Sequence, residues 1–151
     1  MPDKNIKPLL KETYLAFIKN SIGSRSFKNF YSKINKKKQD VLNDGELSCA
    51  FFVSTIVTIF GLSKKIHTTV NSTVDDLLKF GWVEVRRPRI GAVLVWESLN
   101  FEEEEHKHIG FYIAKDESIS NSSVNKVPQK HHWNFNGKRK VIKILCNEKL
   151  K

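Results

Sequence analysis

The spacing of apolar residues along the chain changes near residue 81. Before this point, apolar side chains recur every three or four positions, which is the pattern of one face of a helix. Four such stretches predict helices that begin near Leu9, near Phe27, at Ser48 and at a cap formed by Ser72 or Thr73. The first eighty or so residues are therefore expected to be mainly helical.

The third stretch, residues 48–62, is the most hydrophobic part of the chain. Eight of the eleven positions 50–60 are apolar. The length of the stretch and its closing Gly61 favour a helix buried on all sides over a strand. Ser48 stands at the N-cap position, which places Cys49 in the first helical turn.

After residue 81 the chain consists of short runs rich in valine, isoleucine and aromatic residues, separated by turn-forming residues. Helices followed by strands indicate an α+β fold, in which an antiparallel sheet carries helices on one side. We expect one domain over 1–151, with a helical part at about 1–80 and a sheet part at about 81–147. The predicted strands are Trp82–Val85, Ala92–Trp96, His108–Ala114, Ser118–Asn121 and Val141–Cys146.

The composition is that of an ordinary globular domain. Of the 151 residues, 40% are hydrophobic and 28% charged, and the two cysteines cannot form a disulfide framework. No apolar run reaches the roughly 20 residues of a membrane span. The first twenty residues contain no signal-peptide core, so we expect a cytoplasmic protein, with export by another route as the alternative.

The charge is strongly positive, with 26 lysines and arginines against 16 acidic residues. Such an excess attracts any polyanion, including nucleic acid, anionic lipid headgroups and acidic cell-wall polymers. The basic clusters at 36–38, 86–89 and 138–140 are, taken singly, typical of solvated surface. A basic nucleic-acid-binding module, with Cys49 as a buried structural residue, therefore remains an alternative.

Cys49 and His108 are the strongest candidates for chemistry. At a helix N-terminus, free backbone N–H groups favour a thiolate and can form half of an oxyanion hole, so we expect a depressed pKa for Cys49. His108 begins a predicted strand, where its imidazole could take the thiol proton and return it to a leaving group. If the next strand pairs antiparallel with it, Asn121 lies beside His108 and can orient the ring.

The other histidines leave two possibilities open. His106 with His108, and His131 with His132, are pairs that could bind zinc, but no cysteine or aspartate completes a familiar ligand spacing, so no metal is expected. His131 or His132 could instead line a substrate cleft or lie on the surface. By composition and position, Cys146, Trp82 and Trp96 are expected to belong to the core.

Three blocks of sequence resemble the NlpC-type and CHAP-type cysteine peptidases of the papain-like superfamily. They are Ser-Cys-Ala-Phe-Phe-Val at 48–53, Pro to Gly-Ala-Val-Leu-Val-Trp at 88–96, and His-Ile-Gly-Phe-Tyr-Ile at 108–113. The blocks follow the family's order and approximate spacing, and the resemblance covers residues 44 to about 121. It implies a papain-like α+β fold, with the nucleophile at the N-terminus of a central helix packed on the sheet.

The resemblance also implies a chemistry. It makes Cys49 the nucleophile, His108 the general base and Asn121 the third member, a position where NlpC-type enzymes often have histidine. Such enzymes typically hydrolyse amide bonds in peptidoglycan stem peptides without a metal or cofactor. Ser48 before the cysteine, and Ala50 and Phe51 after it, depart from the usual Asp-Cys-Ser-Gly pattern that helps to bind the stem peptide. Acyl transfer or thioester cleavage by the same thioester intermediate is the nearest alternative.

Overall fold

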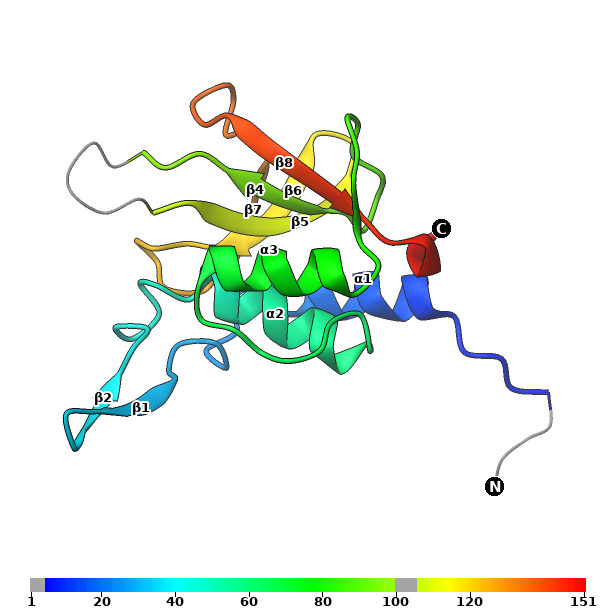
Figure 1. The fold of residues 1–151 in the computed structure, drawn as a ribbon. Helices are drawn as coiled ribbons and strands as arrows, with labels where there is room; N and C mark the ends of the chain where they lie inside the picture. Colours follow the sequence, from blue (N-terminus) through cyan, green and yellow to red (C-terminus); the bar gives the residue numbers. More distant parts are fainter. Residues whose placement is uncertain (1–4, 100–105) are drawn as a thin grey trace.

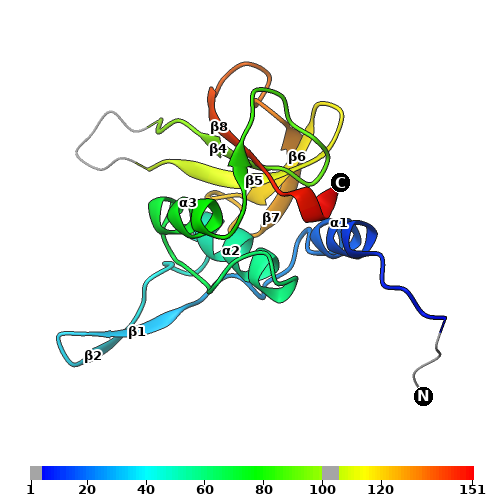
Figure 2. The same cartoon turned by 45° about the vertical axis from the view of Figure 1, so that its right-hand side comes forward.

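The fold was obtained as a computed structural model, in which residues 5–99 and 106–151 are described. This part of the chain forms an α+β structure with three α-helices, a six-stranded antiparallel sheet and a separate two-stranded hairpin. The helices lie together on one side of the six-stranded sheet, and the hairpin projects away from both (Figures 1 and 2). The predicted α+β class, with helices on one side of an antiparallel sheet, is confirmed.

Three of the four predicted helices form, each with a local reason for its limits. The hydroxyl of Thr69 accepts the backbone N–H of Ser72 at 3.2 Å, so the last helix is capped earlier than expected. Gly61 adopts a φ of +68°, which ends the central helix as its position predicted. That helix is buried over most of its surface but leaves Ile59 56% exposed, so it is not buried on all sides. The elements are α1 (Leu10–Asn20), α2 (Cys49–Ile59), α3 (Val70–Lys79) and the short 3₁₀ helix η1 (Glu148–Leu150).

The helix predicted from Phe27 is wrong, because this segment ends in the hairpin of β1 (Tyr31–Ile34) and β2 (Lys37–Asp40). Asn35 and Lys36 between the strands both have positive φ, 50° and 67°, which is the geometry of a tight hairpin turn. The apolar residues that suggested a helix serve another purpose. The rings of Phe27 and Phe30 pack against the Phe51 ring of α2.

The large sheet has the strand order β3-β8-β4-β5-β6-β7, with every neighbouring pair antiparallel. The five strands predicted after residue 81 all form. The sixth was missed because its polar sequence, Pro-Gln-Lys-His-His, does not look like a buried strand. The strands are β3 (Val83–Glu84), β4 (Val93–Trp96), β5 (His108–Ala114), β6 (Glu117–Asn121), β7 (Pro128–His132) and β8 (Val141–Cys146).

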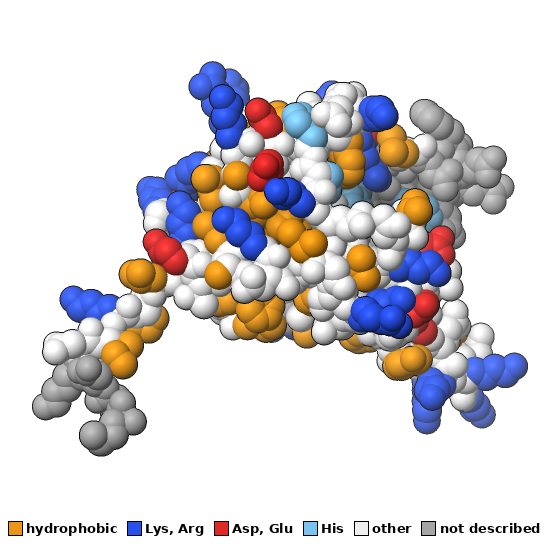
Figure 3. All heavy atoms as spheres, turned by 180° about the vertical axis from the view of Figure 1, so that it is seen from behind, with side chains coloured by type: hydrophobic (Ala, Val, Ile, Leu, Met, Phe, Trp, Pro, Cys, Tyr) orange, Lys and Arg blue, Asp and Glu red, His pale blue; other side chains and the backbone are white. Residues whose placement is uncertain are grey.

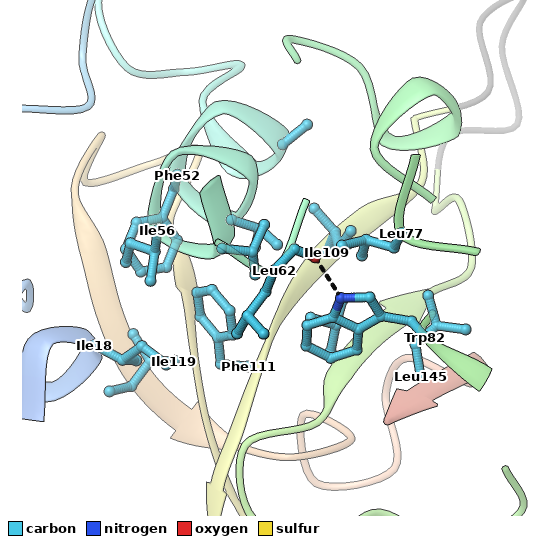
Figure 4. Packing of buried hydrophobic residues seen from close by; sticks show 14 of the residues in the cluster. Ile18, Phe52, Ile56, Leu62, Leu77, Trp82, Ile109, Phe111, Ile119 and Leu145 are labelled. Carbon is cyan, nitrogen blue, oxygen red and sulfur yellow. Dashed lines mark hydrogen bonds between the residues drawn. The ribbon is translucent and has the colours of Figure 1, made fainter. Parts of the chain in front are cut away.

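Alternate side chains of the sheet form two separate apolar clusters. The larger one packs the sheet against the helices, and Figure 4 shows Phe111 and Ile109 of β5 within it. In the same view the indole N–H of Trp82 donates to the Leu62 carbonyl at 2.7 Å, joining the start of the sheet to the end of α2.

The opposite face of the sheet carries the second cluster, around Leu94, Trp96 and Cys146. Trp82, Trp96 and Cys146 are all buried, as predicted. Within residues 5–99 and 106–151, no helix has the length and hydrophobicity needed to cross a lipid bilayer.

Candidate active site

Cys49 is the first residue of α2, as the sequence predicted. The residue is partly exposed and lines a pocket of about 750 Å³. Backbone N–H groups of Ile109, Ala50 and Cys49 lie on the side of the thiol where they lower its pKa. Ser48 occupies the N-cap position, but its hydroxyl makes no capping hydrogen bond. The N–H groups of the first helical turn are thus left available at the pocket.

The pKa of Cys49 is the reverse of what its helix position suggested. Burial raises the pKa of the thiol above its ordinary value, and the surrounding N–H groups and the charge of Arg139 only partly oppose this. The resting group is therefore a neutral thiol near neutral pH. The helix N-terminus favours the thiolate as expected, but the loss of water around the sulfur costs more.

His108 is the first residue of β5 and lines the same pocket as Cys49. Its ring packs on the indole of Trp96, its partner across the sheet, with ring centroids 5.4 Å apart. Burial, followed by the positive charges of Arg139 and His131, lowers the pKa of His108 from 6.5 to about 3. The imidazole is neutral at physiological pH, which is the form that can accept a proton.

Asn121 also lines the pocket. Contrary to the prediction, it does not hold the imidazole of His108. Its amide N–H donates to the carbonyl of Gly45 at 2.8 Å, and its Oδ1 atom is buried without a hydrogen-bond partner among the described residues. The reason is the alternation of side chains along β6. Asn121 faces the helices, whereas His108 belongs to the opposite face. Asn121 instead tethers the loop that leads into Cys49.

Ser120, the residue before Asn121, occupies the place beside His108. Its Oγ atom lies 2.8 Å from Nε2 of His108 and 2.7 Å from Nε2 of His131 on β7. Ser120 pairs with Gly110 in the sheet, and so shares a face with His108 two residues away. The antiparallel pairing that suggested Asn121 therefore also indicated Ser120. The alternation of side chains along a strand was the signal that could have separated the two.

Gly110 makes this arrangement possible. A Cβ atom at this position would lie 2.7 Å from both the Ser120 Cβ and the Ile119 carbonyl oxygen, and 3.0 Å from the Trp96 ring. Each distance is shorter than an ordinary van der Waals contact. The absence of a side chain at Gly110 lets Ser120 and Trp96 close in around His108.

Arg139 is a further pocket residue that the sequence did not single out. It lies in the basic cluster 138–140, which was expected to be solvated surface, but its side chain is partly buried. Its Nε donates to the Glu97 carbonyl at 2.7 Å, and its Nη2 donates to the His106 carbonyl at 3.1 Å. These contacts fix a positive charge near Cys49. Nothing in the local sequence distinguishes Arg139 from the lysines on either side of it.

The remaining histidines do not assemble a metal site in the described part of the chain. No group of three or more histidine, cysteine, aspartate or glutamate residues is arranged there to bind an ion, and Cys49 and Cys146 are both free thiols. His106 lines the pocket. His132 accepts the backbone N–H groups of Asn134 and Asn136 at 3.3 and 3.2 Å, which is a structural role in the turn after β7.

Comparisons with known proteins add no relative to this picture. No protein-family model matches the chain, and no curated protein is significantly similar to it. The functional argument therefore depends on the pocket itself: a thiol at a helix N-terminus, a neutral imidazole at a strand start, and a fixed guanidinium between two carbonyl groups.

Proposed function

We propose that this protein is a cysteine hydrolase that cleaves an amide bond through a thioester intermediate. The observation that carries the proposal is the shared pocket, into which α2 presents the Cys49 thiol and β5 presents the neutral imidazole of His108. The pocket is large enough for a peptide segment, and its mouth is open. The motif order of the papain-like cysteine peptidases agrees with this pairing of helix cysteine and strand histidine.

The first step is attack by sulfur. His108 takes the proton of the Cys49 thiol as the sulfur forms a bond to the carbonyl carbon of the substrate. Because the resting pair is a neutral thiol and a neutral imidazole, this proton moves during the attack rather than before it. The backbone N–H groups at the start of α2 can stabilise the carbonyl oxygen as it becomes negative.

The second half of the reaction returns the proton. The imidazolium of His108 protonates the leaving amine, the carbon–nitrogen bond breaks, and a thioester to Cys49 remains. His108 then deprotonates a water molecule, which attacks the thioester and releases the carboxylic acid and the thiol. Arg139 supports both stages, because its fixed charge favours negative charge near the sulfur and disfavours a long-lived imidazolium.

Peptidoglycan stem peptides are the proposed substrate class. Two cationic side chains, Lys107 and Arg139, lie in the pocket with Cys49, and stem peptides carry free carboxylates that these cations can bind. The remainder of the lining mixes apolar side chains such as Val70 with hydroxyl, amide and imidazole groups and one carboxylate, Glu46, which suits a short polar peptide. Acyl transfer to an acceptor other than water uses the same thioester and differs only in its second step.

The nucleophile is tested with purified peptidoglycan and its soluble fragments. We expect the full chain to release new amine and carboxyl ends, measured by mass spectrometry, and Cys49→Ala to abolish this release. Cys146→Ala is the matched control, because Cys146 is 3% exposed in the second apolar cluster and should be dispensable for turnover. Turnover that survives Cys49→Ala, or its absence from the wild-type protein, contradicts the proposal.

The pH dependence tests the neutral resting pair. Because burial raises the pKa of Cys49 above its ordinary value of 9.0, its alkylation by iodoacetamide should accelerate with pH beyond that value. Since the pKa of His108 is lowered to about 3, the acidic limb of turnover should lie far below pH 6.5. An alkylation rate that is already constant at neutral pH would indicate a thiolate–imidazolium pair instead.

A second candidate function is binding to a polyanion through the hairpin β1–β2. The strands and turn carry four exposed lysines, and they project from the body of the protein at the lower right of Figure 3. If binding to duplex or single-stranded nucleic acid is this protein's function, its affinity should fall linearly with salt on a double logarithmic plot and should be unchanged in Cys49→Ala. The lysines are Lys33, Lys36, Lys37 and Lys38.

A further inference from the structure

Three side chains, His108 in the pocket and Ser120 and His131 beyond its lining, form a continuous series of hydrogen bonds. The Nε2 atom of His108 lies 2.8 Å from the hydroxyl of Ser120, and this hydroxyl lies 2.7 Å from Nε2 of His131. The other ring nitrogen of His131, Nδ1, lies 2.8 Å from the backbone carbonyl of His132. All three distances are those of well-formed hydrogen bonds.

The carbonyl at the far end of this series sets the direction of every bond. A carbonyl oxygen only accepts, so Nδ1 of His131 carries a proton. In neutral His131 the Nε2 atom then has only a lone pair, and the hydroxyl of Ser120 must donate to it. The single proton of that hydroxyl is thereby used, so the Ser120 oxygen accepts from Nε2–H of His108.

This order leaves Nδ1 of His108 without a proton. Nδ1 is then the nitrogen with a free lone pair, which the thiol proton requires. The opposite tautomer would place a proton on Nδ1 and would leave His108 unable to act as a base from that atom. The His132 carbonyl, at the far end of the three hydrogen bonds, thus determines which ring nitrogen of His108 carries the proton.

Neighbouring aromatic side chains hold the three hydrogen-bonded residues, His108, Ser120 and His131, in place. The His131 ring stacks on Phe135 with centroids 4.1 Å apart and planes 9° from parallel. The indole of Trp96 packs against both His108 and His131 at 5.4 Å, and Ser120 is 3% exposed. In such apolar surroundings hydrogen bonds are stronger, and few alternative partners compete for the same protons.

We propose that Ser120 and His131 are positioning residues that fix His108 in its Nε2–H tautomer and so make its Nδ1 atom the base. This inference rests on the proposed function and replaces Asn121 as the group that orients the imidazole. His131, which the sequence left as either a cleft or a surface residue, acts through Ser120 without touching the substrate. Ser120 and His131 transfer no proton during the reaction.

The tautomer is measured directly by long-range ¹H–¹⁵N NMR of the full chain, which distinguishes protonated from unprotonated ring nitrogens. In the wild-type protein at neutral pH we expect His108 to be protonated at Nε2 and His131 at Nδ1. In His131→Phe, which keeps a flat ring against Phe135 but removes the acceptor, His108 should become a mixture of tautomers. A His108 protonated at Nδ1 in the wild-type protein would overturn the inference, whether or not any turnover has been found.

Turnover provides the second measurement, with Ser118→Ala as the matched control for Ser120→Ala. Ser118 is buried on the same face of β6, but its hydroxyl has no partner among the described residues. We expect Ser120→Ala to lower kcat by at least about tenfold with little change in KM, against a ceiling of about 10⁴-fold for a wrong tautomer. Ser118→Ala should leave kcat unchanged, and Ser120→Thr, which retains a hydroxyl, should recover part of the loss.

The double variant Ser120→Ala with His131→Phe shows whether the two residues act in series. Both residues determine which nitrogen of His108 carries the proton. The loss in kcat of the double variant should therefore equal that of Ser120→Ala alone, rather than the product of the two single losses. Equal kcat values for Ser120→Ala and Ser118→Ala would overturn the inference while leaving Cys49 as the nucleophile. Failure of Cys49→Ala to abolish turnover would instead overturn the proposed function, and the tautomer would still be decided by NMR.

Discussion

The two faces of strands β5 and β6 differ in what they are built from and in what they do. Toward the helices, Ile109, Phe111 and Ile119 are fully buried in the main core. On the opposite face, the same strands present His108 and Ser120, which are linked by a hydrogen bond. The helix-facing side of these two strands is closed by apolar contact, whereas the other side carries hydrogen-bonded polar groups beside the second apolar cluster.

The pocket forms where the two faces meet at the ends of these strands. Cys49 approaches from the helix side, where its sulfur lies near the N–H of Ile109, while His108 approaches from the other side. Asn121 and Ser120 show the same division within two consecutive residues. Asn121 faces the helices and holds the loop before α2, and Ser120 faces away and holds the imidazole. Stability and chemistry are thus separable by position in the strand, which three substitutions can test.

The largest loss of stability is expected from a substitution on the helix-facing side of β5. Phe111→Ala removes a ring that is fully buried and packs edge-to-face against Tyr14 and Phe52. We expect a loss of about 3–5 kcal/mol in the free energy of unfolding, measured by urea denaturation. Ile142→Ala, at a side chain 42% exposed on β8, is the control and should change it by less than about 0.5 kcal/mol. Equal losses in the two variants would contradict the assignment of the core.

A smaller loss of stability, with a larger loss of chemistry, is expected at Gly110. Gly110→Ala forces a methyl group against Ser120 and Trp96, so we expect a cost of about 1–3 kcal/mol and a displaced His108. Gly137→Ala is the control, because its added Cβ meets nothing within 4 Å and only its φ of +82° is strained, at about 1 kcal/mol. Turnover per folded molecule should fall in the first variant and stay unchanged in the second.

The smallest loss of stability is expected at Asn121, where a substitution distinguishes its role from that of Ser120, its neighbour on β6. Asn121→Ala removes the hydrogen bond to the Gly45 carbonyl, but it also removes a buried oxygen without a partner among the described residues. The two changes offset each other, so we expect a loss of only about 1 kcal/mol in stability. The NMR signature of the His108 tautomer should be unaffected. A changed tautomer in Asn121→Ala would restore Asn121 as the orienting residue and break the comparison between the faces.

Local patterns in the sequence were sufficient for most of the elements. β5 and β8 have the limits expected from their runs of branched and aromatic residues, and α2 begins at Cys49 as its N-cap position indicated. The hairpin β1–β2 and strand β7 were missed, for opposite reasons. The first has apolar residues at helical spacing that pack onto α2, and the second is a polar strand at the edge of the sheet.

The residues of the candidate site were likewise only partly predictable from the sequence. Cys49 and His108 were found because each begins an element, and the start of an element is visible in a single sequence. Ser120 and Arg139 were not found as site residues, and His131 was left as either a cleft or a surface residue. The roles of Ser120 and His131 depend on strand pairing, and that of Arg139 depends on a distant backbone carbonyl. The pKa of Cys49 could not be predicted from its helix position, because the cost of removing water depends on everything that surrounds the sulfur.

By itself the sequence determined the α+β class, three of the helices and five of the strands, including the helix that begins with a cysteine and the strand that begins with a histidine. These follow from the spacing of apolar residues and from turn-forming residues, which act over a few positions. Only the tertiary structure decided which neighbour of the imidazole holds it, which cation lies near the sulfur, and which tautomer the hydrogen bonds allow. Those outcomes depend on register and burial, where a shift of one residue moves a side chain to the other face of the sheet.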